Sequence, residues 1–70
     1  MPEIIVHMAA GRTPEQKKKL MTSISEAVVS SIGAPLDAVT VQIVEAPLDD
    51  KMKGGQTFAE RAAAKAKERA

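Results

Sequence analysis

The first nine residues are apolar at nearly every position and rich in isoleucine and valine. A short β-branched run of this kind predicts a strand over residues 2–9. Successive side chains of a strand point to opposite faces, so Ile4 and Val6 would share one face and Ile5 and His7 the other. Because both faces are largely apolar, we expect the strand to be covered on both sides.

A helical period replaces this pattern after residue 13. The apolar side chains that recur at helical spacing are Leu20, Ile24, Ala27, Val28 and Ile32. Thr13 is suited to cap the helix, Pro14 to occupy its first position, and Gln16 to complete a capping box. Gly33 is placed to end it in a left-handed conformation, and a proline follows two residues later. The pattern predicts a helix over residues 14–32.

Alternation returns in residues 39–46, where Val39, Val41 and Ile43 would share one face. A strand, a helix and a second strand in this order predict a β-α-β unit with parallel strands and a right-handed crossover. Two strands and one helix leave a sheet face and both edges open. We therefore expect partner subunits to cover them.

The last third of the chain begins with a polar loop that contains a Gly54-Gly55 turn, which suits a short hairpin. Thr57 and Glu60 then form a second capping-box pattern, and Phe58 is the main apolar anchor of the tail helix that follows. We expect this helix to lie on a neighbouring subunit.

The predicted fold class is α+β. We expect residues 1–70 to form a single small β-α-β domain with two parallel strands, one long helix and a short C-terminal hairpin and helix, assembled as an oligomer.

Composition supports assembly. The chain has 70 residues, of which 44% are hydrophobic, with one aromatic residue, one histidine and no cysteine. It is too apolar for a disordered chain, yet near the lower size limit for a domain that folds alone. Without disulfide or thiolate metal sites to stabilise it, it is expected to complete its core with further copies. No cofactor or metal is expected, and the lone His7 is interpreted as a packed residue.

Two classes of partner are not expected. The formal net charge is only +1, and the Lys17-Lys18-Lys19 run has no interleaved aromatic residues, so we interpret it as a solvated helix face and expect no nucleic acid. No apolar run is long enough to span a membrane, and no signal-peptide pattern opens the chain. We expect no membrane association and a cytoplasmic location.

Pro2 is the candidate for chemistry. If Met1 is removed, Pro2 carries a free secondary amine, whereas behind a retained Met1 its nitrogen is a non-basic amide. An α-amino group has a pKa of roughly 7.7–8.0, and burial or a nearby cation moves it toward neutrality. Such an amine is suited to general base catalysis.

Several further features occur with Pro2 in a linked order: the Gly11-Arg12-Thr13 loop, the Ala34-Pro35-Leu36 turn, the second strand and the Gly54-Gly55 pair. In this combination the chain resembles the tautomerase superfamily, specifically its small 4-oxalocrotonate tautomerase (2-hydroxymuconate tautomerase) family, over residues 2–55.

The resemblance implies a hexamer built as a trimer of dimers, with active sites near subunit interfaces and no cofactor. It implies that Pro2 is the general base that moves a proton in an unsaturated 2-oxo acid, and that Arg12 binds a substrate carboxylate. A guanidinium suits both tasks, because it binds carboxylates bidentately and favours a neutral amine nearby.

Two positions depart from the family pattern. The second arginine of the family falls at Thr40, which offers a hydroxyl without charge, and the aromatic residue of its pocket falls at Lys51. Lys51 or Lys53 could supply replacement charge. The resemblance thus marks Thr40 and Lys51 as further substrate-binding candidates.

Three functions remain open from the sequence. The first is an isomerase that uses Pro2 and Arg12. The second is a hydratase or dehalogenase of unsaturated acids, for which Glu45 and Asp49 are the carboxylates considered for water activation. The third, motivated by Thr40, is a non-catalytic or complementing subunit of a hetero-hexamer.

Overall fold

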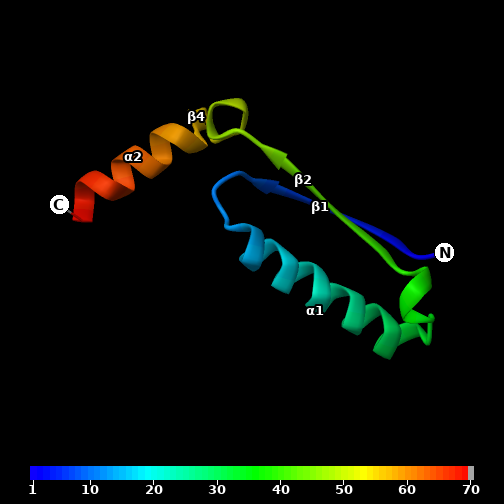
Figure 1. Cartoon of the computed structure of the whole chain (residues 1–70). Helices are drawn as coiled ribbons and strands as arrows, with labels where there is room; N and C mark the ends of the chain where they lie inside the picture. Colours follow the sequence, from blue (N-terminus) through cyan, green and yellow to red (C-terminus); the bar gives the residue numbers. More distant parts are fainter. Residues whose placement is uncertain (70) are drawn as a thin grey trace.

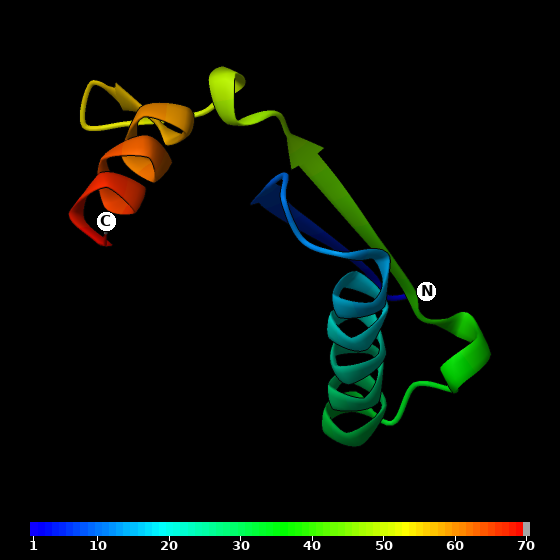
Figure 2. The ribbon, with the colours of Figure 1, turned by 60° about the vertical axis from the view of Figure 1, so that its left-hand side comes forward.

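The computed structural model describes residues 1–69. Its central unit consists of strand β1 (Glu3–Ala9), helix α1 (Pro14–Ile32), the short 3-10 turn η1 (Leu36–Ala38) and strand β2 (Thr40–Ala46). The two strands pair in parallel, from Glu3 opposite Thr40 to Ala9 opposite Ala46. Helix α1 lies along one side of this pair (Figures 1 and 2). The predicted β-α-β unit is confirmed.

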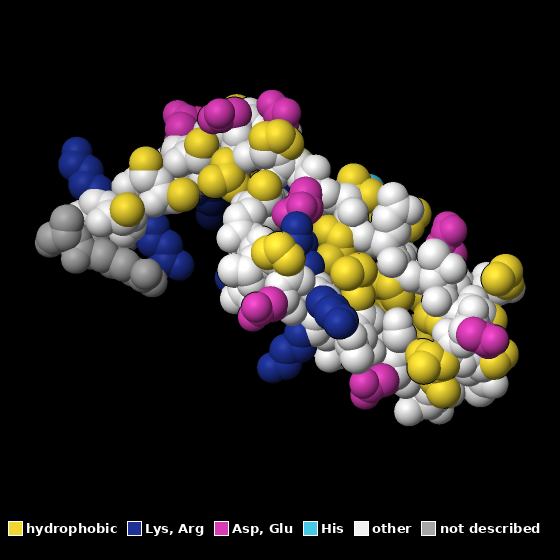
Figure 3. All heavy atoms as spheres, in the orientation of Figure 1, with side chains coloured by type: hydrophobic (Ala, Val, Ile, Leu, Met, Phe, Trp, Pro, Cys, Tyr) yellow, Lys and Arg dark blue, Asp and Glu magenta, His cyan; other side chains and the backbone are white. Residues whose placement is uncertain are grey.

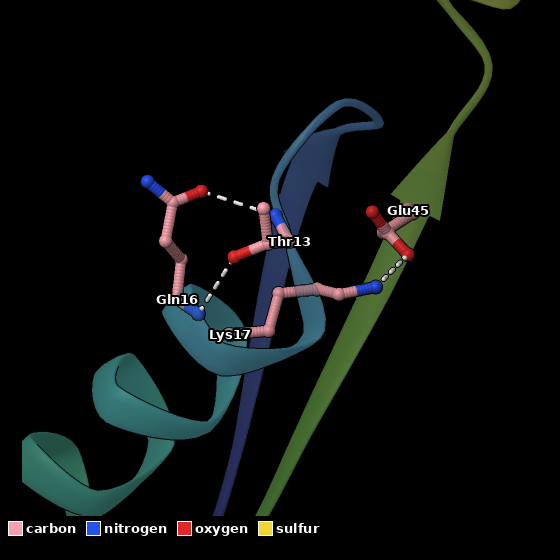
Figure 4. Close-up of polar contacts among 4 residues, drawn as sticks. All are labelled: Thr13, Gln16, Lys17 and Glu45. Atoms are coloured by element: carbon pink, nitrogen blue, oxygen red, sulfur yellow. Dashed lines mark hydrogen bonds and ion pairs between the residues drawn. The ribbon is translucent and has the colours of Figure 1, made fainter.

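Local capping defines both ends of α1. Thr13 and Gln16 exchange two hydrogen bonds: the Gln16 amide donates to the Thr13 hydroxyl at 3.1 Å, and the Thr13 amide to the Gln16 side-chain oxygen at 3.0 Å (Figure 4). At the other end, Gly33 adopts a φ of 72° and donates its N–H to Val29 at 3.0 Å. Both caps satisfy backbone groups that would otherwise lack partners. The helix therefore has the predicted bounds.

The chain continues through the 3-10 turn η2 (Leu48–Asp50), the hairpin strands β3 (Met52–Lys53) and β4 (Gln56–Thr57), and helix α2 (Phe58–Arg69). Gly54 and Gly55 both have positive φ, as a tight two-residue hairpin turn requires. The second predicted capping box is also present, between Thr57 and Glu60. Helix α2 projects away from the β-α-β unit (Figure 1).

The Lys17-Lys18-Lys19 run differs in part from its interpretation as a solvated face. Lys18 and Lys19 are exposed, but Lys17 is half-buried and its Nζ lies 2.9 Å from the Glu45 carboxylate (Figure 4). This ion pair joins the first turn of α1 to β2. The helix turns Lys17 toward the sheet because it lies on the same face as the apolar Met21 and Ile24.

A fully buried core is absent from the part of the chain that the structure describes. The side chains between α1 and the strands are only half-buried: Ile4, Val6, Met8, Val41 and Ile43. The radius of gyration is 15.8 Å, whereas about 11 Å is typical of a compact chain of this length. The accessible surface of 5463 Å² likewise exceeds the roughly 4,200 Å² expected for a compact protein of this mass.

The strands turn their other side away from α1, and this open sheet face carries apolar residues. Ile5 is 49% exposed and Val44 39% exposed. Figure 3 shows apolar side chains at the surface of both the β-α-β unit and the tail. The protomer thus leaves exposed the kind of surface that a folded protein normally buries.

Candidate functional site

Pro2 lies at the start of β1, beside the last turns of α1. It is half-buried, and its carbonyl accepts a hydrogen bond from the Thr40 amide at 3.0 Å, which ties the beginning of the chain to β2. A groove of about 370 Å³ opens beside Pro2. The other residues that line this groove are Glu3, Ile4, Ala27, Val28, Ser31 and Ile32. Pro2 therefore borders a mainly apolar hollow.

Thr40 is joined to Pro2 through the backbone, but its side chain lies on the other face of the sheet. Pro2 and Ile4 are half-buried toward α1, whereas Glu3 and its partner Thr40 are exposed. Side chains alternate along a strand, so paired residues share a face. Within one chain, the Thr40 hydroxyl belongs to the open sheet face and not to the Pro2 groove.

Arg12 lies in the loop that connects β1 to α1, at the opposite end of the β-α-β unit from Pro2 (Figure 1). It borders one hollow of about 260 Å³ against the start of α1, and a second of about 390 Å³ that Phe58 also lines. No carboxylate among the described side chains forms an ion pair with Arg12. Its guanidinium is exposed and available to an external anion.

Lys51 belongs to the same end of the protomer as Arg12. Its Nζ lies 5.8 Å from the centre of the Phe58 ring, and the Phe58 amide donates a 2.8 Å hydrogen bond to the Lys51 carbonyl. The sequence interpretation treated Phe58 only as an anchor of the tail helix. Its place as the only aromatic residue, just after the double-glycine turn, was the signal available for a role at this end.

The distance along β1 separates the two groups of candidates. A strand rises about 3.3 Å per residue, so Pro2 and Arg12 lie roughly 20 Å or more apart. That span is much longer than a small organic acid. The structure brings Pro2 close to the Thr40 backbone and places Arg12 and Phe58 around one hollow, but one chain does not bring Pro2 and Arg12 to a common small ligand.

The remaining sequence candidates lie elsewhere. Glu45, considered for water activation, is engaged by Lys17, and Asp49 is exposed in η2. His7 is exposed on the open sheet face, next to Val44 of β2. Within residues 1–69, no three potential metal-ligating side chains gather in one place. In the same part of the chain, neither helix is long and apolar enough to cross a membrane.

One carboxyl at this end has a perturbed pKa. The Thr57 backbone N–H, and then its hydroxyl, hydrogen-bond the Glu60 carboxylate and lower the pKa of Glu60 below its ordinary value. The effect stabilises the hairpin-to-helix junction directly before Phe58.

Comparison with known proteins shows the following similarities. A family model described as "Tautomerase enzyme" matches residues 2–61. A probable tautomerase of Bradyrhizobium diazoefficiens is 61% identical over 64 residues, covering 91% of this chain and 96% of that protein. The 2-hydroxymuconate tautomerase of Pseudomonas sp. strain CF600 is 41% identical over 56 residues, covering 80% of this chain and 89% of that protein.

A solved structure shares the fold as well. A hetero-hexameric 4-oxalocrotonate tautomerase from Chloroflexus aurantiacus superimposes with a TM-score of 0.80 at 33% identity, covering 86% of this chain and 97% of that chain.

Proposed function

This chain belongs to the tautomerase family, and from that premise we propose that it is an isomerase that moves a proton within an unsaturated 2-oxo or 2-hydroxy acid. Pro2 acts as the general base and acid after Met1 is removed, and Arg12 binds a substrate carboxylate. The observation that carries the proposal is a proline directly after Met1, which becomes amino-terminal when Met1 is removed, at the start of a β-α-β unit of the tautomerase family.

Removal of Met1 is the first requirement. Met1 is 97% exposed in the protomer, which supports its access to an aminopeptidase before assembly. The freed amine of Pro2 then takes a proton from the hydroxyl of a 2-hydroxy (enol) acid, or from the carbon next to the carbonyl of a 2-oxo acid. The negative charge left behind is delocalised over the conjugated acid as a dienolate, and the same amine delivers the proton to a different atom of the conjugated system, so substrate and product are isomers.

We propose that each working site is shared between copies of the chain. Pro2 and Arg12 lie too far apart in one protomer to hold the same small acid, and the open sheet face leaves apolar surface for partners to cover. A homo-hexamer would satisfy both conditions. Arg12 from one copy would lie near Pro2 of another, where its charge favours the neutral amine and stabilises the developing oxyanion.

Turnover of 2-hydroxymuconate or phenylenolpyruvate tests the chemistry. Pro2→Ala should lose nearly all activity, because alanine provides a primary amine of different basicity and geometry. Measured masses of the chain and of the assembly must first show that the variant loses Met1 and assembles as wild type does. A correctly processed Pro2→Ala protein with wild-type turnover would refute the role of Pro2.

Subunit complementation tests the shared site. Pro2→Ala and Arg12→Ala homo-oligomers should each be nearly inactive, and unfolding and refolding them together should restore part of the activity. Mixed oligomers would contain some sites with an intact Pro2 from one chain and an intact Arg12 from the other. If co-assembled variants recover nothing, both residues act within one chain or the roles are wrong.

A second candidate function is that of a complementing subunit in a hetero-hexamer. The uncharged Thr40 and the similarity to a hetero-hexameric tautomerase favour it. The purified chain alone would then be inactive and would gain activity only with an unlike tautomerase chain. The hydratase and dehalogenase alternative has less support, because Glu45 is paired with Lys17; halide release from a haloacrylate would test it.

A further inference from the structure

We propose that Lys17 and Glu45 are positioning residues, whose ion pair holds the loop that carries Arg12 against the end of β2. The Arg12 guanidinium then has a defined place in which to receive a carboxylate. The inference deepens the proposed function and rests on it for the role of Arg12 as the carboxylate anchor. It gives a task to two side chains that the proton transfer itself does not use.

The loop between β1 and α1 is not fixed from within. Gly11 has a φ of 130°, which residues with a Cβ rarely adopt, and it directly precedes Arg12. Both residues are exposed, and no backbone hydrogen bond within residues 1–69 involves either of them. The place of Arg12 therefore depends on how the two ends of the loop are held.

Two adjacent residues of β2 hold these ends. At the first end, the Ala10 amide donates to the Ala46 carbonyl at 2.9 Å. At the second end, the Lys17 Nζ lies 2.9 Å from the Glu45 carboxylate, and Figure 4 shows the Lys17 side chain reaching from α1 across to β2. The Lys17 amide also donates to the Thr13 carbonyl at 3.0 Å, which continues the connection to the residue after Arg12.

The ion pair also lies beside the proposed carboxylate site. Lys17 lines the hollow of about 260 Å³ that Arg12 borders. The first turn of a helix disfavours a cation, because the helix dipole leaves partial positive charge there, and the Glu45 carboxylate compensates it. The two side chains are only 25% and 30% exposed, so water screens their attraction less than that of a fully exposed pair.

Nitrogen-15 relaxation of the backbone amides measures the ordering of the loop, whether or not the protein turns over a substrate. In wild type, Gly11 and Arg12 should have order parameters close to those of the strands, about 0.85. Lys17→Met and Glu45→Gln should each lower them toward the flexible range, because one end of the loop is released. Lys18→Met is the matched control, since it removes the same charge from an exposed position one residue further along.

Turnover of phenylenolpyruvate gives the second readout. Lys17→Met and Glu45→Gln should lower kcat/KM by about two- to fivefold, the scale of one partly exposed ion pair, and mainly through KM. Lys17→Arg should behave as wild type, because it can form the same pair. Glu45→Gln also distinguishes positioning from direct attraction: it frees the Lys17 ammonium beside the Arg12 hollow, so direct attraction of the substrate by Lys17 would lower KM.

The outcomes separate this inference from the proposed function. The inference is wrong if the loop stays ordered in both Lys17→Met and Glu45→Gln, if Lys18→Met loosens it equally, or if Glu45→Gln lowers KM. If Lys17→Met fails to assemble, Glu45→Gln, which keeps the shape of the native side chain, decides the question. A loop that loses order in both variants, in a protein without any turnover, would refute only the proposed function. Intact turnover with an ordered loop in both variants would refute only this inference.

Discussion

The open sheet face makes assembly sensitive to one substitution, Ile5→Asp. Ile5 is 49% exposed in the protomer. Complete burial of an isoleucine contributes about 1.5–3 kcal/mol, so burial of the remaining half in an interface would contribute about 1 kcal/mol per copy. An unpaired carboxylate in the same place adds a desolvation cost of several kcal/mol, and every copy in a homo-oligomer bears it. We therefore expect Ile5→Asp to prevent assembly.

Sedimentation velocity at micromolar concentration measures the result directly. Wild type should sediment as an oligomer, and Ile5→Asp as a smaller species with reduced thermal stability, because the protomer has no fully buried residue among those described. Ser23→Asp is the control, since it adds the same charge to an exposed position of α1. Ile5→Val, which removes one methylene, should remain assembled.

The reasoning fails if Ile5→Asp keeps the wild-type sedimentation coefficient and melting temperature. The open sheet face would then not be an interface, and the exposed apolar area of the protomer would need another explanation. Equal dissociation by Ser23→Asp would show that added negative charge, and not its place on the sheet, disrupts the assembly.

Two further predictions concern the helix ends. The pKa of Glu60 is lowered in the folded chain, so the hydrogen bonds of its carboxylate contribute stability above pH 4.5, the ordinary pKa, and this stability is lost as the pH falls through the lower pKa of the folded state. In an NMR titration from pH 6 to 3, the Thr57 amide should respond in wild type. It should not respond in Glu60→Gln, whose side-chain oxygen still accepts the hydrogen bond, as that of Gln16 does, but does not titrate. Gly33→Ala should lower the free energy of unfolding by about 1 kcal/mol, measured in urea at fixed protein concentration, because the backbone φ at this position is 72° although nothing lies within 4 Å of the added Cβ. Gly33→Asn should lower it less, because asparagine tolerates this conformation better, and equal losses would contradict the backbone explanation.

Local signals were sufficient for the elements. The capping box of Thr13 and Gln16 and the left-handed Gly33 define the bounds of α1 through hydrogen bonds within a few residues, so no distant contact is needed to predict them. The same holds for the Gly54-Gly55 hairpin. Parallel pairing of the strands follows from one connecting helix.

The candidate residues were predictable by type, but their neighbours were not. The order of motifs along the chain singled out Pro2 and Arg12, yet only the length and direction of β1 place them at opposite ends of the β-α-β unit. In the same way, strand alternation separates the Thr40 side chain from Pro2 although their backbones are hydrogen-bonded.

Long-range contacts could not be predicted from local sequence patterns. The Lys17–Glu45 ion pair joins residues 28 positions apart, and the Lys51–Phe58 contact depends on how the hairpin folds back. By itself, the sequence determined the elements, their order and the residue types suited to proton transfer, because these depend on periodicity and capping. Only the tertiary structure decided that Lys51 lies over the Phe58 ring and which apolar face remains open, because both depend on how the elements pack in space.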